Sequence, residues 1–265
     1  MRVLILGGTG EARALATLLA ADGGFDVVSS LAGRVADPLH PPGGVRTGGF
    51  GGAEGLSRYL VDERVDRVVD ATHPFAARMT AHAVTAAGAA GVPLAVLRRP
   101  GWRAGPGDRW CRVPSVAAAA ALVTGTVAEG GVVLLTLGRG DVEAFAGDAG
   151  RHYVVRSIDP PGGPLPPRHT VVLARGPFSP AGERSLLGEH GVDLVVSRAS
   201  GGDATAPKLA AAREAGLAVV LVDRPPLPQG VTRVTDAAAA RDWLRHPAGQ
   251  SGRGGGILDR GPSSR

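Results

Sequence analysis

The sequence predicts an α/β protein made of two parallel-sheet halves, and three observations lead to this fold class. Short runs of Val, Leu and Ile alternate with Ala-rich stretches along most of the 265 residues. The apolar runs are continuous, which is typical of strands buried on both faces of a sheet. A segment rich in Gly and Pro, residues 100–114, interrupts the alternation and separates halves of similar size. We therefore expect two Rossmann-like halves with a ligand-binding cleft between them.

The first half covers residues 1–99. Its first helix is well defined, because small and apolar residues between positions 12 and 19 recur at helical spacing and share one face. The expected elements, in chain order, are strands at 3–6, 27–31, 45–47, 67–70 and 94–97 and helices at 11–21, 53–63 and 76–87.

The second half covers residues 115–246, with 100–114 as a linker. Ser115 is the expected N-cap of an Ala-rich helix, and Pro207 is tolerated in the first turn of another. The expected elements are helices at 115–123, 183–189, 207–215 and 236–245 and strands at 132–137, 153–156, 171–173, 194–197 and 218–222. Residues 247–265 are rich in Gly, Ser and Arg and are expected to form a disordered tail.

Composition argues against several classes of function. The net charge is +5, but the arginines are scattered and aromatic residues make up only 4%, so nucleic-acid binding is not expected. No apolar stretch is long enough to span a membrane, and the start lacks the apolar region of a signal peptide, so we expect a cytoplasmic protein. The single Cys111 and the scattered histidines predict neither an internal disulfide nor a metal site. Anionic small molecules remain plausible ligands.

A glycine loop, Gly7-Gly8-Thr9-Gly10, follows the first strand and opens a helix. Backbone N–H groups and the helix dipole hold phosphate at such a place, although an ordinary tight turn would look the same. The dinucleotide fingerprint is only partly met, because Arg13 occupies its last glycine position. Glu11 at the start of the helix is unfavourable for an anion and could instead cap the helix.

The end of the second strand favours NADP over NAD. An NAD site usually carries an acid there, whereas this segment has Ser29, Ser30 and, slightly further on, Arg34. A guanidinium bonds phosphate oxygens in pairs, so Arg34 suits a 2′-phosphate, unless it is an ordinary surface arginine. After the third strand, a glycine run that includes Gly51 would let backbone approach a ligand, or would simply be a flexible loop.

The fourth strand ends in Asp70-Ala71-Thr72-His73-Pro74-Phe75. Ligands of open α/β sheets sit beyond the carboxyl ends of strands, so Asp70 and His73 are candidate acid–base groups. The alternative is that Asp70 and Thr72 cap the next helix, and both roles are compatible.

These motifs together resemble a known family. GGTGEA, SLAGR, GGFGG and DATHPFA, in this order and spacing, resemble the precorrin-6A reductases, NADPH-dependent enzymes of cobalamin (vitamin B12) biosynthesis. Blocks of the second half also match: RPGW at 99–102, LTLGR at 135–139, RGPF at 175–178, SGG at 200–202 with Thr205 and Lys208, and Arg224-Pro225. The resemblance extends from Met1 to about residue 228. It implies two Rossmann-like halves that reduce a double bond of the precorrin-6A macrocycle to give precorrin-6B, and a related branch acts on the cobalt-containing macrocycle.

The resemblance also implies a distribution of site residues. The candidates for binding NADPH are Gly7, Gly8, Thr9, Gly10, Glu11, Ser30, Arg34, Gly51, Thr72, His73, Pro74 and Phe75. The macrocycle carries many carboxylates, and the candidates for binding it are Arg139, Arg175, Gly176, Arg198, Ser200, Gly201, Gly202, Thr205, Lys208 and Arg224. The candidates for proton transfer are Asp70, His73 and Lys208. One departure matters: Arg198-Ala199 stands where the family has Lys-Asn or Lys-Asp, and an arginine hardly deprotonates.

Two other functions remain open on the sequence. One is a different NADP-dependent reductase or epimerase, although Tyr59 and Tyr153 lack the lysine four residues on that short-chain enzymes carry. The other is a non-catalytic module that senses NADPH. We expect a monomer that binds a tetrapyrrole, with at most transient contact with neighbouring enzymes of the pathway.

Overall fold

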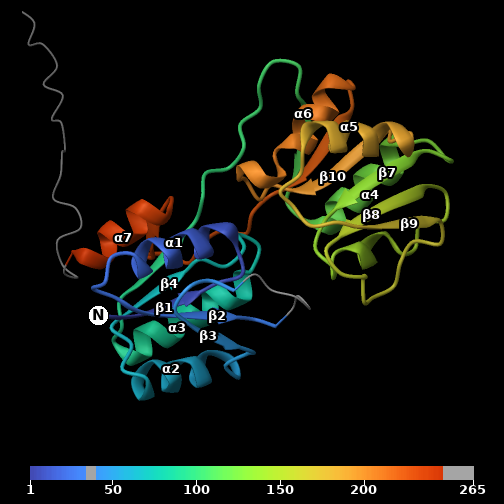
Figure 1. Cartoon of the computed structure of the whole chain (residues 1–265). Coiled ribbons are helices and arrows are strands. Elements are labelled where there is room, and N and C mark those ends of the chain that lie inside the picture. Colours follow the sequence, from blue (N-terminus) through green and yellow to red (C-terminus); the bar gives the residue numbers. More distant parts are fainter. Residues whose placement is uncertain (34–39, 247–265) are drawn as a thin grey trace, which may run out of the picture.

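The computed structural model describes residues 1–33 and 40–246 and contains two six-stranded parallel sheets. Each sheet carries helices and forms its own lobe, as Figure 1 shows. The predicted α/β class with two parallel-sheet halves is confirmed. Arg34 and the tail 247–265 lie outside the described residues.

The first lobe has the strand order β12-β5-β4-β1-β2-β3. Its elements are β1 (Arg2–Leu6), α1 (Gly10–Ala20), β2 (Asp26–Leu31), β3 (Gly44–Thr47), α2 (Gly52–Asp62), β4 (Arg67–Asp70), α3 (Ala77–Ala90), β5 (Leu94–Leu97), β12 (Thr232–Val234) and α7 (Ala237–Arg245). The central strands are buried on both faces, as their continuous apolar runs predict.

The second lobe has the order β6-β11-β10-β7-β8-β9. Its elements are β6 (Arg109–Val113), α4 (Val116–Thr126), β7 (Val132–Thr136), η1 (Val142–Phe145), β8 (His152–Ser157), β9 (His169–Leu173), α5 (Pro180–Glu189), β10 (Leu194–Arg198), η2 (Asp203–Thr205), α6 (Pro207–Glu214) and β11 (Ala218–Val222). Ser115 caps α4 by accepting from the Ala118 amide, as predicted.

The strand pairing divides the chain differently from the predicted ranges, at both ends of the predicted second half. Within the predicted linker, β6 pairs with β11 in the second sheet. At the other end, β12 pairs with β5 in the first sheet, and α7 packs against the first-lobe core through Ala240 and Leu244. In Figure 1, α7 lies beside α1. The boundary at 115–246 is therefore wrong at both ends: residues from β12 onward belong to the first lobe, and β6 belongs to the second.

Both corrections concern edge strands, whose sequences lack the apolar run of a buried strand. β6 reads Arg-Trp-Cys-Arg-Val and buries only its last residue, while β12 has three residues and buries only Val234. Edge strands commonly carry charges or are short, because their free edges must not recruit other chains.

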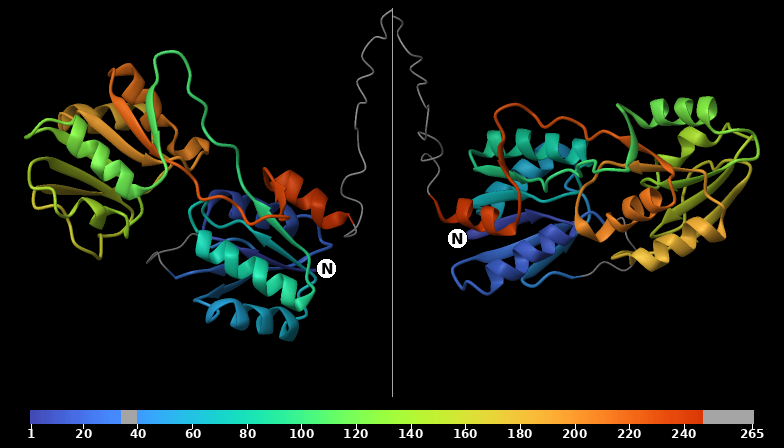
Figure 2. Two further views of the ribbon diagram at one scale, coloured as in Figure 1. Left: turned by 180° about the vertical axis from the view of Figure 1, so that it is seen from behind. Right: turned by 90° about the horizontal axis from the view of Figure 1, so that it is seen from above.

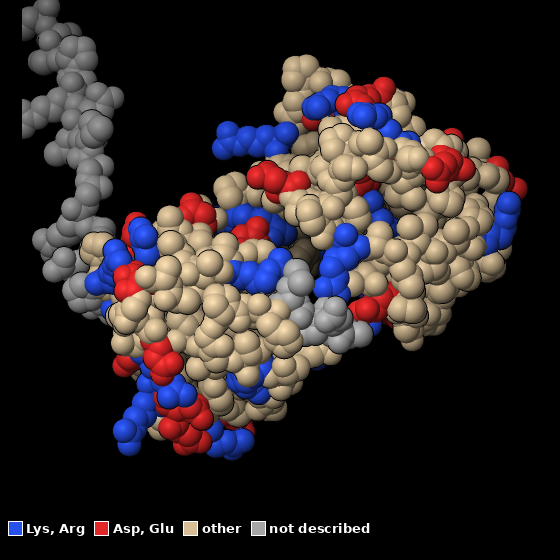
Figure 3. Space-filling model, in the orientation of Figure 1, with Lys and Arg blue, Asp and Glu red and all other residues tan. Residues whose placement is uncertain are grey.

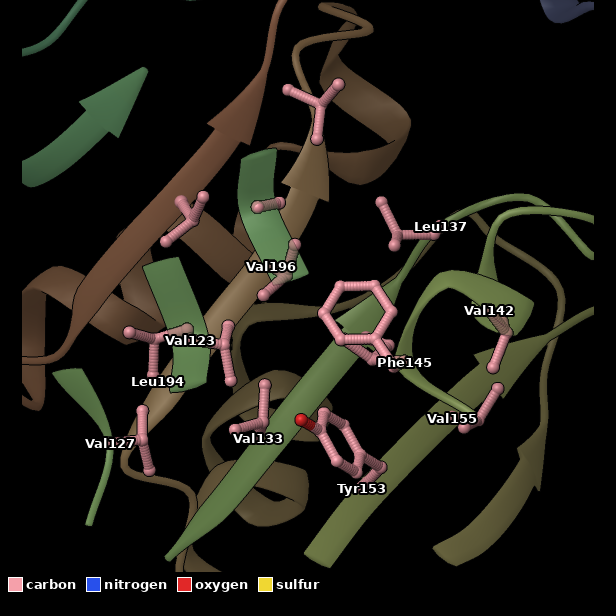
Figure 4. Close-up of a cluster of buried hydrophobic side chains, with 14 of the residues drawn as sticks. Val123, Val127, Val133, Leu137, Val142, Phe145, Tyr153, Val155, Leu194 and Val196 are labelled. Atoms are coloured by element: carbon pink, nitrogen blue, oxygen red, sulfur yellow. The ribbon is translucent and has the colours of Figure 1, made fainter. Parts of the chain in front are cut away.

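A well-packed core holds the second lobe together (Figure 4). Tyr153 and Phe145 are almost fully buried, with ring centroids 5.5 Å apart, and Val133, Val155 and Val196 pack around them. The Tyr153 hydroxyl donates to Asp148 Oδ2 at 2.6 Å, which satisfies the one polar atom of this ring. The second sheet is therefore a rigid platform for the loops at its strand ends.

The chain crosses between the lobes twice, after β5 and after β11 (Figure 2). We call residues 98–102 and 223–226, which form the two crossings, the hinge. Hydrogen bonds join the crossings directly: Arg98 donates to the Pro225 carbonyl at 2.8 Å, and Arg224 donates to the Arg99 carbonyl at 2.8 Å. None of the helices in the described part combines the length and hydropathy that crossing a bilayer would need.

The packing of β12 and α7 in the first lobe leads to a stability prediction. Leu244 is fully buried in the first-lobe core although it lies near the end of the described chain. We expect Leu244→Ala to lower the free energy of unfolding by about 2–5 kcal/mol, because it leaves a cavity in that core. Urea unfolding measures this change, with Val61→Ala, at a position that is 61% exposed, as the control. Equal, small changes in both variants would show that α7 does not contribute to the core.

Candidate functional site

The predicted phosphate loop has the geometry of a dinucleotide turn. Gly7 donates its amide to the Ser30 carbonyl at 2.9 Å, which ties the loop to the end of β2. Gly8 has a φ of +105°, which side chains other than glycine rarely adopt. Thr9 is the N-cap of α1: its hydroxyl accepts from the Ala12 amide and donates to the Ala71 carbonyl at 2.7 Å. The helix N-terminus therefore lies directly after β1, where an anion would be stabilised.

At the neighbouring strand ends, an arginine that the sequence analysis did not select contacts Ser30. Arg46 of β3 donates to Ser30 Oγ at 2.7 Å and to the carbonyls of Gly48 and Gly49 at 3.1 Å. Its guanidinium lies 3.7 Å from the centre of the Phe50 ring. Its place at the carboxyl end of a parallel strand, just before a glycine run, is the signal that could have identified it. Gly51, a predicted cofactor residue, has a φ of +81° at the N-cap of α2.

Asp70 serves as an anchor for the loop that follows β4. Its carboxylate is buried and accepts from the Thr72 amide at 3.1 Å, the Thr72 hydroxyl at 2.6 Å and the Thr80 hydroxyl at 2.6 Å. These bonds engage both oxygens and join the loop to α3. The geometry fits the predicted role of Asp70 and Thr72 in holding this loop, and acid–base catalysis by Asp70 stays a prediction.

His73 is the group of this loop that faces the second lobe. Its Nδ1 accepts from the Phe75 amide at 3.3 Å, so its proton is on Nε2. Burial and the nearby charges of Arg99, Arg198, Arg224 and Lys208 lower the pKa of His73 to about 3. The imidazole is therefore neutral at physiological pH and can donate a hydrogen bond from Nε2 without releasing a proton.

Phe75 carries the same loop into the second lobe, with Pro74 between it and His73. The Phe75 ring packs against the second-lobe core, and the Arg198 guanidinium lies 5.0 Å from its centre. Arg198 is held in turn by Asp141, whose Oδ2 accepts from Nε at 2.7 Å and from a terminal nitrogen at 2.5 Å. The carboxyl ends of β4 and β10 therefore face one another across the lobes.

Arg99 lies two residues after β5 and links α1 to the second lobe. It bonds Glu11 at 2.7 Å through one terminal nitrogen and donates to the Ser200 carbonyl at 2.7 Å through Nε. Glu11 therefore does not cap α1, which Thr9 does; instead its charge is neutralised by an arginine of the hinge. This pairing reduces the repulsion that a lone carboxylate would exert on an anion at the start of the helix.

Arg224 braces the hinge. It donates to the carbonyls of Ala199 at 2.7 Å, Arg99 at 2.8 Å and Pro100 at 3.1 Å. Burial and the neighbouring arginines lower its pKa to about 10. Beside it lies a cavity of about 260 Å³, lined in part by Trp102, Ala199 and Arg224. The donors of this predicted substrate residue are thus engaged with backbone oxygens.

Gly201 and Gly202 are explained by the hinge packing. Both have positive φ values, and a Cβ at Gly201 would lie 2.2 Å from the Pro100 carbonyl oxygen. A Cβ at Gly202 would lie 2.9 Å from Nε of Arg99. The predicted anion-binding role of this loop is untested, but the close approach of Pro100 and Arg99 already requires glycine at both positions.

Lys208 lies in a buried charged cluster of the second lobe. It is 3% exposed, donates to the Thr205 carbonyl at 3.1 Å, and its ammonium lies 5.1 Å from the centre of the Trp102 ring. Burial, followed by the charge of the nearby Arg156, lowers its pKa to about 7, although Glu183 opposes the shift. Lys208 is thus partly deprotonated near neutral pH.

The rest of this cluster is a buried ion pair. Glu183 at the start of α5 accepts from Arg156 at 2.9 Å, and both side chains are less than a tenth exposed. The Arg156 guanidinium also lies 4.0 Å from the centre of the Phe178 ring. Gly176, a predicted substrate residue, lets Phe178 fold back, because a Cβ there would lie 3.3 Å from the ring.

Arg139 and Arg175 are the exposed members of the predicted substrate set. Arg139 follows β7 and lies 3.9 Å from Asp159, and Arg175 follows β9. Figure 3 shows Lys and Arg side chains on both sides of a hollow between the two lobes. A polycarboxylate would meet a surplus of positive charge at such a place.

The structure thus brings the two predicted residue sets together. His73 of the first lobe feels the charges of Arg198, Arg224 and Lys208 of the second. Sequence reasoning selected these residues because they lie at strand ends or close to adjoining glycine loops. Arg99 also follows a strand, but it was not selected because it stands next to the predicted linker. The described residues include no group of three or more His, Cys, Asp or Glu side chains arranged to hold a metal ion.

A family model described as precorrin-6x reductase CbiJ/CobK matches residues 2–245. The chain belongs to this family. Membership makes it an oxidoreductase, in agreement with the resemblance that the motifs carry. A solved structure titled CobK precorrin-6A reductase superposes with a TM-score of 0.85 at 44% identity and covers 92% of this chain and 96% of that one. This match confirms the arrangement of two parallel-sheet lobes.

Curated relatives agree. Precorrin-6A reductase of Rhodococcus erythropolis is 50% identical over 243 residues, which are 92% of this chain and 97% of the relative. Precorrin-6A reductase of Rhodobacter capsulatus is 46% identical over 228 residues, or 86% and 89% of the two chains. A cobalt-precorrin-6A reductase of Priestia megaterium is 26% identical over 249 residues, or 88% and 94%.

The buried lysine leads to a prediction about pH and stability. Between pH 7 and pH 10.5 the unfolded chain binds a proton at Lys208 that the folded chain does not, so this residue makes stability rise with pH over that window. Below pH 7 both states are protonated and the full penalty of burying the charge remains. We expect Lys208→Met to be more stable than the parent chain at pH 7 by roughly 1–3 kcal/mol, and the difference to shrink by pH 10.

Urea unfolding of both proteins at pH 7 and pH 10 measures this difference. Because every other titrating group is shared, the change in the difference isolates Lys208. A difference that stays constant with pH would contradict a lowered pKa at this position.

The contact between Glu11 and Arg99 leads to a second prediction. The pair joins the first lobe to the hinge, and both side chains are mostly buried. We expect a double-mutant cycle of Glu11→Gln and Arg99→Gln to give a coupling of about 1 kcal/mol in the free energy of unfolding. Additive effects of the two substitutions would show that the ion pair contributes nothing to stability.

Proposed function

We propose that this chain reduces one double bond of precorrin-6A, with NADPH as the hydride donor, to give precorrin-6B. The observation that carries this function is the meeting of the two lobes at neutral His73, which is surrounded by Arg99, Arg198, Arg224 and Lys208. A polyanionic macrocycle needs such a cationic site, and a dinucleotide needs the glycine loop at its first-lobe side. Family membership and the coverage of the relatives support the same reaction.

The cobalt-free macrocycle is the favoured substrate. The relatives named precorrin-6A reductase are 50% and 46% identical to this chain, whereas the one named cobalt-precorrin-6A reductase is 26% identical. Since the two groups share the family and the fold, the higher identity supports the substrate of the first group.

The first-lobe residues fit a dinucleotide. Gly8 adopts the left-handed conformation, Thr9 caps α1, and a Cβ at Gly8, Gly48 or Gly51 would meet no atom of the described residues within 4 Å. The backbone N–H groups of the loops after β1 and β3 are therefore not covered by side chains of the described residues. The loop at Gly7–Gly10 would hold the diphosphate, and Thr72 and His73 would border the nicotinamide end.

When bound, NADPH supplies the hydride, and the chain's own residues do the rest. Asp70 fixes the loop that presents His73, and Phe75 seals that loop against the second lobe. Neutral His73 can orient an acceptor atom through its Nε2 proton, whereas the Arg198 guanidinium holds its protons too tightly to transfer one. The proton that completes the reduction therefore comes from water or from Lys208, whose pKa of about 7 suits proton transfer.

A direct test combines the purified protein with precorrin-6A under anaerobic conditions and NADPH that carries deuterium at its transferable position. We expect stoichiometric oxidation of NADPH and a product that has gained one deuterium and one solvent hydrogen, measured by mass spectrometry. Cobalt-precorrin-6A, tested in parallel, is expected to react more slowly.

The outcomes separate the alternatives. If NADPH is oxidised with cobalt-precorrin-6A but not with precorrin-6A, the substrate of this chain is the cobalt-containing macrocycle. Binding of NADPH without turnover of either macrocycle would favour a non-catalytic NADPH-sensing module.

A further inference from the structure

Neither the motifs nor the comparisons assign a role to Arg46. It lies at the carboxyl end of β3, in register with Ser30 of β2. Ser30 in turn accepts from the Gly7 amide through its carbonyl. Arg46 is therefore one strand away from the loop that begins the dinucleotide site, at the sheet edge where the adenosine end of a dinucleotide lies.

The guanidinium of Arg46 is held in one orientation. It stacks on the Phe50 ring at 3.7 Å, and its two terminal nitrogens donate to Ser30 Oγ, the Gly48 carbonyl and the Gly49 carbonyl. The stacking depends on Gly55, because a Cβ at that position would lie 1.7 Å from the Phe50 carbonyl oxygen. A planar cation fixed in this way loses little freedom when it binds an anion.

Its charge has no counter-ion among the described residues: none of the carboxylates there lies within 4.0 Å of Arg46. The nearby Glu63 pairs with Arg2 instead. A preoriented arginine that contacts only neutral oxygens and a ring retains its full capacity to attract an anion.

Ser30 adds a second donor. Because its oxygen accepts from Arg46, its own hydroxyl proton is free to donate to an anion. Among the described residues the space above the glycine run is open, since a Cβ at Gly48, Gly49 or Gly52 would meet none of their atoms within 4 Å. Donors and positive charge therefore coincide at the ends of β2 and β3, and none of the described residues at these two strand ends is an acid that could bond a ribose hydroxyl.

We propose that Arg46, with the Ser30 hydroxyl, binds the adenosine 2′-phosphate of NADPH and sets the preference of this chain for NADPH over NADH. The inference rests on the proposed function, because it concerns the cofactor of the same site. The competing role for Arg46 is a purely structural one, in which its bonds to Gly48 and Gly49 only hold the glycine loop in shape.

Binding measurements separate these two roles. The variants are Arg46→Gln, which removes the charge, and Arg46→Lys, which keeps it without the planar fork. Calorimetric titration with NADPH, NADH, 2′,5′-ADP and AMP gives dissociation constants that do not depend on turnover. Arg58→Gln on α2, where the side chain is exposed, is the control for a change of one charge near the site.

We expect Arg46→Gln to weaken binding of NADPH and 2′,5′-ADP roughly ten- to a hundredfold, and binding of NADH and AMP less than about threefold. Arg46→Lys is expected to fall between this variant and the parent chain, and Arg58→Gln to match the parent chain. Near-ultraviolet circular dichroism and thermal unfolding verify that each variant is folded.

Equal losses for phosphorylated and unphosphorylated ligands would overturn the inference and leave Arg46 as a brace of the loop. If both Arg46 variants fail to fold, the role of Arg46 is structural and the inference is overturned. A parent chain that binds NADH as well as NADPH, or neither, would instead contradict the NADPH dependence of the proposed function.

Discussion

The hydrogen bonds of Arg224 to the carbonyls of Ala199, Arg99 and Pro100 connect the two lobes to each other. These oxygens belong to the first crossing and to the end of β10, while Arg224 itself lies in the second crossing, so one side chain joins three backbone segments. Arg99 is then aimed at Glu11 at the start of α1. The helix that would receive the cofactor is thereby connected to the lobe that would receive the substrate.

A second constraint is electrostatic. Several cations of the cleft are paired or bonded before any ligand arrives: Arg198 with Asp141, Arg99 with Glu11, and Arg224 with carbonyls. Such contacts hold side chains in place at little entropic cost on binding. The charges of Arg99, Arg198 and Arg224 nevertheless still act on His73: burial first, and then these charges, lower its pKa to about 3. A polyanionic substrate relieves this excess charge, which favours its binding over that of neutral molecules.

Much of the fold could be predicted because its central strands are apolar on both faces. The strands at 67–70, 94–97 and 218–222 have the same bounds in the structure as in the prediction. Edge strands β6 and β12 were missed, because a strand with one solvent-facing side or only three residues carries no such run. The site was predicted in part by the rule that ligands lie beyond strand ends, which identified His73 and Arg198. The roles of Arg224 and Lys208 could not be predicted, since they depend on which oxygens their side chains meet after folding.

The return of the chain to the first lobe, where it forms β12 and α7, also limits how the two lobes can move. A single connection between two lobes would leave their relative rotation nearly unrestricted, whereas two adjacent connections restrict it to bending about the hinge. Here the two crossings are bonded to one another through Arg98 and Arg224. Bending at the hinge would change the distance between the strand ends of the two sheets most, and the packing within each lobe least. The two bonded crossings therefore keep the carboxyl ends of the two sheets facing one another, as the proposed function needs.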